Sequence, residues 1–137
     1  MPTLTRWFIK IALVYLVAAL LLGLLPAFGG LMDLPEWFGA LSPVYFHLFM
    51  VGWVTQLIIG VAYWMFPKYS SERPRRNEQL AWATFWLINV GLLLRVVCEP
   101  LNNQTPNAAW GWLLVLSALV QWAGGLAFCV NTWGRVK

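Results

Sequence analysis

The chain has 137 residues; 61% of them are hydrophobic, only 10% are charged, and the formal net charge is +4. Soluble domains contain roughly 45–50% apolar and about 25% charged residues, and a small fold buries only about two-thirds of its chain's surface. A soluble domain is therefore excluded. The ten Trp residues agree with a membrane protein, because Trp concentrates where a bilayer meets water.

Four segments are long and apolar enough to cross a bilayer, which takes about 20 mostly apolar residues. They cover about residues 7–28, 44–66, 80–98 and 108–133. None alternates polar and apolar residues as barrel strands do, and backbone groups in lipid must be hydrogen-bonded within the segment. The sequence thus predicts an all-α integral membrane protein, a four-helix bundle that forms one domain over residues 1–137.

The first span is expected to end at Pro26, Gly29 and Gly30, because proline interrupts helical hydrogen bonding and glycine is common at helix ends. Its apolar run exceeds that of a typical signal peptide, and no small-residue cleavage site is evident. We therefore expect the first span to be retained.

The second span has two different faces on an ideal helical wheel, at about 100° per residue. One face is aliphatic below a histidine and consists of His47, Val51, Val54, Ile58, Val61 and Met65. The opposite face is small and polar and consists of Gly52, Gln56, Gly60 and Tyr63. Small residues at this spacing allow close helix contact, so the second face is expected to pack inside the four-helix unit. The first face would then line a cofactor cleft or an interface between copies.

His47 is the only histidine of the chain and lies about one turn into its span. Ionisable residues inside a membrane are rare and indicate function by default. A neutral imidazole among aliphatic side chains suits haem, because its nitrogen binds iron while the apolar groups pack the porphyrin. The alternative is an interfacial histidine bonded to a loop carbonyl. Zinc is disfavoured because no further ligands cluster nearby, and no catalytic residue is assigned.

Basic residues mark one side of the predicted bundle. Eight of the nine cations lie there: Arg6, Lys10, Lys68, Arg73, Arg75, Arg76, Arg135 and Lys137. The first loop instead carries Asp33 and Glu36 without Lys or Arg. The positive-inside rule places both termini in the cytoplasm, which predicts a multi-pass protein of the cell's inner (cytoplasmic) membrane. The positive charge is explained by topology, so no nucleic-acid partner is expected.

Arg95 is the one cation outside this set, near the outer end of the third span at a depth similar to that of His47. Its guanidinium could pair with haem propionates, since it matches carboxylates in a bidentate way. The alternative is a local pair with Glu99 at i+4, or snorkelling to the interface, and one arginine could bridge both partners. Pro100 is expected to end this span.

The remaining polar residues within spans are Asn89, Ser117, Gln121 and Asn131. We expect them to form hydrogen bonds between helices rather than a quinone site or a proton path. Gly124 and Gly125 are expected to mark a close helix contact. Cys98 and Cys129 lie at opposite depths, too far apart for a disulfide, which needs Cα atoms within about 7 Å.

A family resemblance supports the haem interpretation. The stretch from His47 to Val54, continuing through Ile58, Gly60, Tyr63 and Pro67, resembles the second transmembrane helix of subunit I in the haem-copper oxidase superfamily. This superfamily includes respiratory cytochrome oxidases and nitric oxide reductases. In it, a histidine near the outer end of this helix ligates the low-spin haem, and His47 matches that histidine in order, depth and direction. The resemblance implies that His47 is the axial iron ligand of a haem b.

The chain also departs from the family pattern. Many relatives carry His-x-His where this chain has Tyr45-Phe46-His47, and a full subunit I has many more spans and histidines. A complete oxygen-reducing centre is therefore not expected. The family holds its low-spin haem between second helices of two four-helix arcs, which implies that this chain self-associates. A dimer would clamp one haem between two His47 side chains, whereas a trimer would leave each haem open to a further ligand.

The leading hypothesis is a membrane haem protein that transfers electrons or binds a diatomic gas, with a redox partner in a respiratory chain. It would be a component of an oxidoreductase rather than a complete oxidase. The first alternative is a haem-free structural or accessory subunit of a respiratory complex. A transporter or channel is disfavoured, because the spans lack a line of charged residues.

Overall fold

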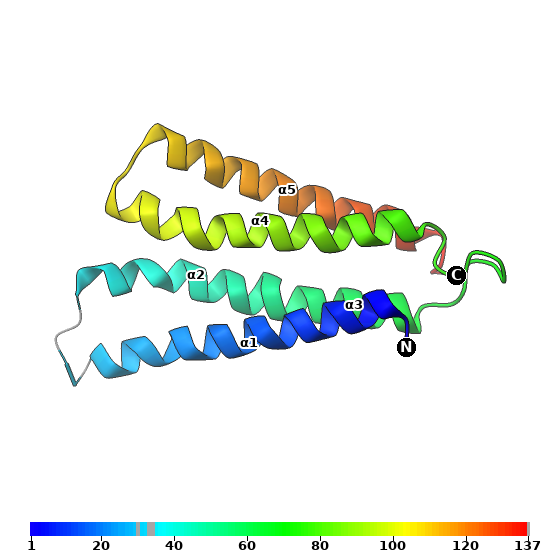
Figure 1. The fold of residues 1–137 in the computed structure, drawn as a ribbon, viewed down its shortest axis with the longest axis horizontal. Coiled ribbons are helices and arrows are strands. Elements are labelled where there is room, and N and C mark those ends of the chain that lie inside the picture. The colour runs from blue at the N-terminus through cyan, green and yellow to red at the C-terminus, as the bar shows by residue number, and fades with distance from the viewer. Residues whose placement is uncertain (30, 33–34, 137) are drawn as a thin grey trace.

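The computed structural model describes residues 1–29, 31–32 and 35–136, and only the backbone of Glu36 and Trp37. The predictions made for Gly30, Asp33 and Lys137, and for the side chain of Glu36, lie outside this description. The elements are α1 (Thr3–Gly29), η1 (Glu36–Leu41), α2 (Ser42–His47), η2 (Leu48–Thr55), α3 (Gln56–Met65), α4 (Glu78–Gln104) and α5 (Ala108–Trp133). All elements of the described residues are helical, which confirms the all-α prediction (Figure 1).

Four helical stretches are long and apolar enough to cross a membrane: Thr3–Gly29, Phe38–Met65, Glu78–Gln104 and Ala108–Trp133. This confirms the four predicted spans. The prediction that Pro100 ends the third span is wrong, because α4 continues through it. A proline removes one helical hydrogen bond, but the next turn still closes: the N–H and the hydroxyl of Thr105 both donate to the Leu101 carbonyl. α1 likewise passes Pro26 before it ends.

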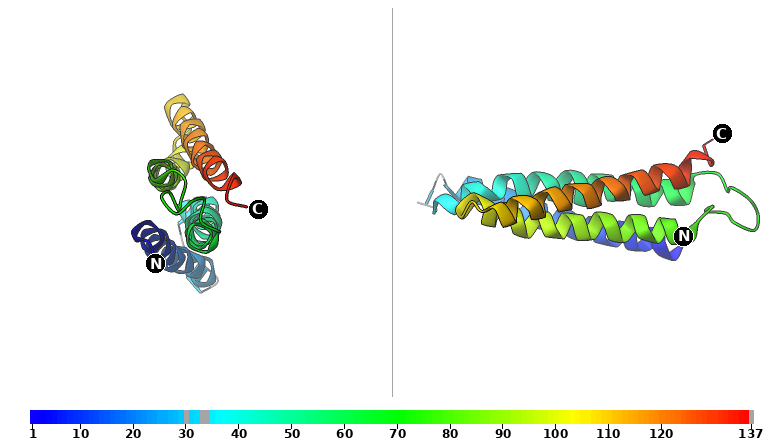
Figure 2. Two further views of the ribbon diagram at one scale, coloured as in Figure 1. Left: turned by 90° about the vertical axis from the view of Figure 1, so that its right-hand side faces the viewer. Right: turned by 90° about the horizontal axis from the view of Figure 1, so that it is seen from above.

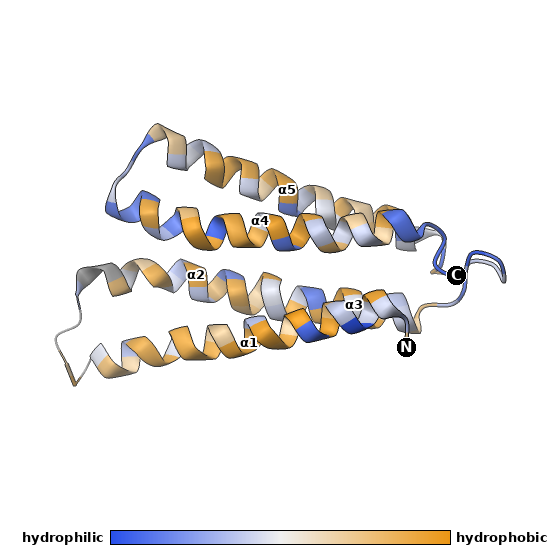
Figure 3. Ribbon diagram, in the orientation of Figure 1, coloured by the Kyte–Doolittle hydropathy of each residue, from blue (hydrophilic) through white to orange (hydrophobic). Residues whose placement is uncertain are grey.

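The helices alternate in direction, and both termini lie at the same end as the loop of residues 66–77 (Figure 1). α1 packs against η2 and α3, α4 packs against α5, and α2 with η2 connects the two pairs by contacting α4. Figure 2 shows α5 on the outside of the group, next to α4. The helices are apolar along most of their length, whereas the loop of residues 66–77 is hydrophilic (Figure 3).

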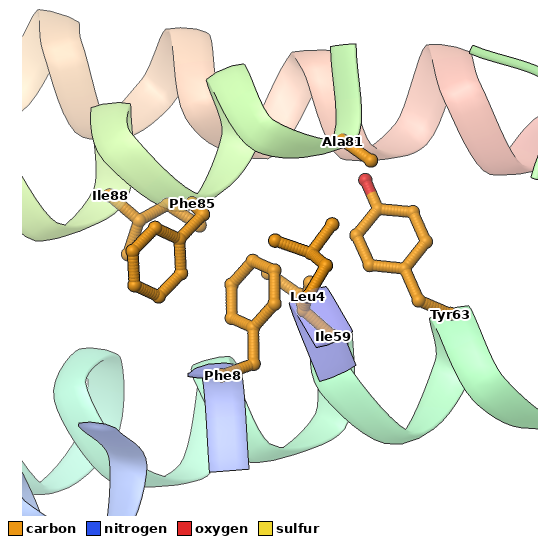
Figure 4. Close-up of a cluster of buried hydrophobic side chains, with 7 residues drawn as sticks. All are labelled: Leu4, Phe8, Ile59, Tyr63, Ala81, Phe85 and Ile88. Atoms are coloured by element: carbon orange, nitrogen blue, oxygen red, sulfur yellow. The ribbon is translucent and has the colours of Figure 1, made fainter. Parts of the chain in front are cut away.

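Two apolar clusters hold the helices together. The first lies toward the end with the termini and contains Leu4, Phe8, Ile59, Tyr63, Ala81, Phe85 and Ile88 (Figure 4). The second lies toward the opposite end and contains Tyr15, Ala19, Val44, Leu48 and Leu92. α5 contributes little to either cluster, apart from Phe128, whose ring centroid is 5.4 Å from that of Tyr63.

A buried polar cluster lies between α1, α3 and α4. The Tyr15 hydroxyl donates to Asn89 Oδ1 at 3.0 Å, and the Asn89 and Gln56 amides donate to each other at 3.0 and 3.2 Å. Asn89 also donates to the Phe85 carbonyl at 2.8 Å. The hydrogen bonds between helices predicted for Asn89 are confirmed, and such bonds are worth about 0.6 kcal/mol each in a membrane.

The other polar residues follow the prediction with one exception. Ser117 donates to the Gly91 carbonyl of α4 at 2.7 Å, and Asn131 bonds both the N–H and the carbonyl of Asn77 at 3.1 and 3.0 Å. Gln121 instead donates to Ser117 within its own helix at 3.1 Å. The helix contacts predicted for Ser117 and Asn131 are thus confirmed, whereas the hydrogen bond of Gln121 stays local.

Two further predictions concern small residues. Cys98 and Cys129 are both free thiols, as expected from their different depths. Gly124 marks a close helix contact, since a Cβ there would lie 2.8 Å from Ile88 Cγ1. The same prediction is wrong for Gly125, where a Cβ would meet nothing within 4 Å. Successive helical residues point about 100° apart, so only one of two adjacent glycines faces the neighbouring helix.

Substituting Gly52 by Ala should destabilise the protein. A Cβ at this position would lie 2.7 Å from Tyr15 Cγ and 3.0 Å from Leu92 Cδ2, so α1 and η2 would have to separate. Such overpacking costs about 1–3 kcal/mol, and we expect a lower melting temperature in detergent. The matched control is Gly125→Ala, which should leave the melting temperature unchanged or raise it. Equal melting of both variants and the wild type would contradict this view of the α1 contact.

Candidate functional site

A π-helical segment, η2, begins directly after His47. Its hydrogen bonds join residues five apart, and the Thr55 hydroxyl reinforces this pattern by donating to the Met50 carbonyl at 2.8 Å. Each residue in such a segment turns less about the helix axis than in an α-helix. The angular relation between residues before and after η2 therefore differs from that of an ideal wheel. π-segments are rare and frequently lie at functional sites.

The change of register corrects the predicted arrangement of the second span. The buried face of Gly52, Gln56, Gly60 and Tyr63 is confirmed. The aliphatic face predicted beside His47 is not continuous, because Val51 packs against both apolar clusters. His47 and Gln56, expected on opposite faces, both contact α4, through Glu99 and Asn89 respectively. His47 thus lies at the junction of the second and third spans.

The imidazole of His47 has one nitrogen occupied and one available. Nδ1 lies 2.8 Å from the Pro43 carbonyl, in the first turn of α2, and the side chain is 23% exposed. A carbonyl can only accept, so Nδ1 carries a proton, and in the neutral ring Nε2 carries the lone pair. Within the described part of the chain, no hydrogen bond reaches Nε2. The partner is a carbonyl of the same helix rather than the loop carbonyl of the alternative, and a bond of this kind is what orients the ring of a metal-ligating histidine.

Arg95 and Glu99 extend the site from α4. Arg95 Nε lies 3.7 Å from Glu99 Oε1, which confirms the local pair, and Glu99 Oε2 lies 3.4 Å from His47 Nδ1. Arg95 Nε and Glu99 Oε2 are nevertheless buried without a hydrogen bond among the described residues. An unsatisfied buried polar group costs about 1–3 kcal/mol. The site therefore favours an additional polar partner from outside the chain, and Arg95 suits a carboxylate.

These residues fit one edge of a haem but do not enclose it. The described residues contain no group of three or more His, Cys, Asp or Glu side chains that could hold a metal ion. A haem would require an axial ligand, a cation for a propionate and an apolar rim, for which the chain offers the His47 imidazole, the Arg95 guanidinium and the exposed side chains of Phe46 and Met50. The opposite wall would have to come from another molecule.

The contact between His47 and Glu99 was not predicted. Glu99 entered the sequence analysis only as a partner for Arg95. The sequence does contain a signal for this contact. The second and third spans run in opposite directions, and His47 and Glu99 lie near the same end of these spans. The sequence does not give the rotation of the second span relative to the third, because this rotation depends on the π-helical segment η2.

Comparison with known proteins identifies one match. The family model described as cytochrome c and quinol oxidase polypeptide I matches residues 3–136, almost the whole chain. No curated protein and no solved structure matches the chain.

Proposed function

Because the chain belongs to the cytochrome c and quinol oxidase polypeptide I family, the subunit I family of haem-copper oxidases, we propose that it is a membrane haem protein with His47 as iron ligand. The observation that carries this proposal is the state of the imidazole. Nδ1 donates to the Pro43 carbonyl at 2.8 Å, which leaves the lone pair of Nε2 for a metal. The same bond orients the ring.

Three other side chains would complete the haem contact on this chain. The Arg95 guanidinium makes no hydrogen bond within the described residues and would bind a propionate. Phe46 and Met50, 59% and 40% exposed, would cover the apolar rim. When bound, a haem b supplies one-electron transfer at iron and, at an open axial position, binding of a diatomic gas. No residue of the chain is assigned a catalytic role.

A homo-oligomer follows from the incomplete site. One chain offers one histidine and one wall, so a second copy would supply the facing wall and, in a dimer, the second His47. A trimer with one haem per chain would leave each iron open to a gas. In either form the protein would act as an oxidoreductase component with a respiratory redox partner. It would lie in the inner membrane with both termini in the cytoplasm, where the positive-inside rule puts the basic loop.

A haem-free accessory subunit is the second candidate. One observation favours it: α5 presents exposed Trp112, Trp122 and Trp133, which a larger complex could cover. The two candidates differ in whether the isolated protein is coloured.

The purified protein, expressed with ample haem, should show a Soret band that shifts on reduction with dithionite. A sharp low-spin α band, one haem per two chains and a detergent-corrected mass of a dimer would indicate a shared pair of His47 ligands. A high-spin spectrum that changes with CO or NO and a trimeric mass would indicate an open site. A protein without a Soret band would overturn the haem proposal and favour the accessory subunit.

A further inference from the structure

We propose that Glu99 is a positioning residue for His47 whose charge sets the reduction potential of the bound haem. This inference rests on the proposed function and adds a residue that the sequence analysis assigned only to a local ion pair. The carboxylate lies 3.4 Å from Nδ1 of the imidazole, whereas Nε2 is the nitrogen that would bind the iron. It comes from α4, so it controls His47 from a different span.

The geometry gives Glu99 an electrostatic role rather than a simple hydrogen-bonding one. The Nδ1 proton is directed to the Pro43 carbonyl at 2.8 Å, while Glu99 Oε2 is buried and has no hydrogen bond among the described residues. The side chain of Glu99 is only 14% exposed, so solvent screens its charge poorly. A carboxylate held there raises the electron density of the imidazole and favours the ferric over the ferrous state.

Arg95 limits this effect without cancelling it. Its Nε is 3.7 Å from Oε1, whereas the contact with His47 is made by the other oxygen, Oε2. The nearer oxygen, Oε2, remains unpaired beside the imidazole. The Glu99 carboxylate thus places negative charge beside His47, and the Arg95 guanidinium supplies the positive charge that would bind a propionate. Both contacts are made at one end of the second and third spans.

The test is the reduction potential of the haem-loaded protein with Glu99→Gln. This change keeps the shape of the side chain and removes its charge, so we expect the ferrous form to be favoured roughly tenfold, an increase of about 59 mV for a one-electron couple. Glu99→Asp keeps the charge and should stay within about half of that shift. Glu72→Gln, an exposed carboxylate in the loop at the other end, is the matched control and should not move the potential.

Several outcomes would overturn the inference about Glu99. The first of them would leave the proposed haem binding by His47 intact. A haem-loaded Glu99→Gln protein with the wild-type potential would show that the charge has no effect, while haem binding by His47 stands. Loss of haem in Glu99→Gln, or equal shifts in the Gln and Asp variants, would indicate that Glu99 only packs against the ring. A wild-type protein that binds no haem would overturn both proposals.

Discussion

Replacing His47 with Ala should abolish the Soret band of the purified protein. The substitution removes the only imidazole of the chain, and with it the nitrogen lone pair that the Pro43 bond leaves available. No other histidine can replace it; Cys98, next to Glu99, is buried, and Cys129 lies near the opposite end of the spans. The expected result is therefore loss of bound haem rather than a modest change in spectrum.

The loss should not reflect unfolding. His47 is partly exposed and makes one hydrogen bond, whose removal costs about 0.5–1.5 kcal/mol. Helix content and detergent melting are expected to remain near those of the wild type. Adding free imidazole should restore part of the band, because a small ligand can occupy the space that the side chain left. Trp64→Ala is the matched control: it truncates an exposed side chain near the other end of the same span and should retain the haem. An unchanged spectrum in His47→Ala would exclude this residue as the ligand.

Replacing Arg135 with Gln should cause the largest loss of stability among the cation substitutions. Arg135 is 2% exposed and lies directly after α5. Its Nε donates to the Pro67 carbonyl at 3.0 Å, and its Nη2 donates to the carbonyls of Phe66 and Tyr63 at 2.8 and 3.3 Å. These carbonyls lie in the last turn of α3 and directly after it, where helical partners are missing, and a cation there also complements the helix dipole.

The cost follows from the number and type of bonds. Hydrogen bonds to a charged group contribute about 1.5–3 kcal/mol each, so loss of the guanidinium should reduce the free energy of unfolding by about 3 kcal/mol or more. Burial also lowers the pKa of the Arg135 guanidinium, which is the cost of holding a charge away from water. α5 would lose a connection to α3, whose other contacts with α5 include the ring of Phe128 against that of Tyr63.

Detergent melting or denaturant titration would measure this effect. Arg135→Lys keeps the charge but not the planar fork, so it should lie between the wild type and Arg135→Gln. Arg73→Gln removes an exposed cation of the nearby loop and should change stability by less than about 0.5 kcal/mol. If Arg135→Gln melts like Arg73→Gln, Arg135 does not connect α5 to α3. Its charge would then matter for topology alone.

The sequence by itself determined the spans, the packing face and the candidate ligand. Hydropathy over about 20 residues is a local property, so four spans followed from it directly. The spacing of Gly52, Gln56 and Gly60 identified the buried face of the second span, because small residues are where membrane helices approach. His47 stood out because so few ionisable groups lie within the spans, and the family resemblance rested on the residues that follow it.

The tertiary structure alone decided how these elements are rotated and joined. The π-helical turn of η2 brings His47 to α4 and Glu99, and no helical wheel with a constant angle can represent it. Arg135 was assigned to topology by its charge, although it is buried against the end of α3, 68 residues away in sequence from Pro67. Composition and periodicity describe each helix separately, whereas rotation and long-range hydrogen bonds arise from packing of several helices at once.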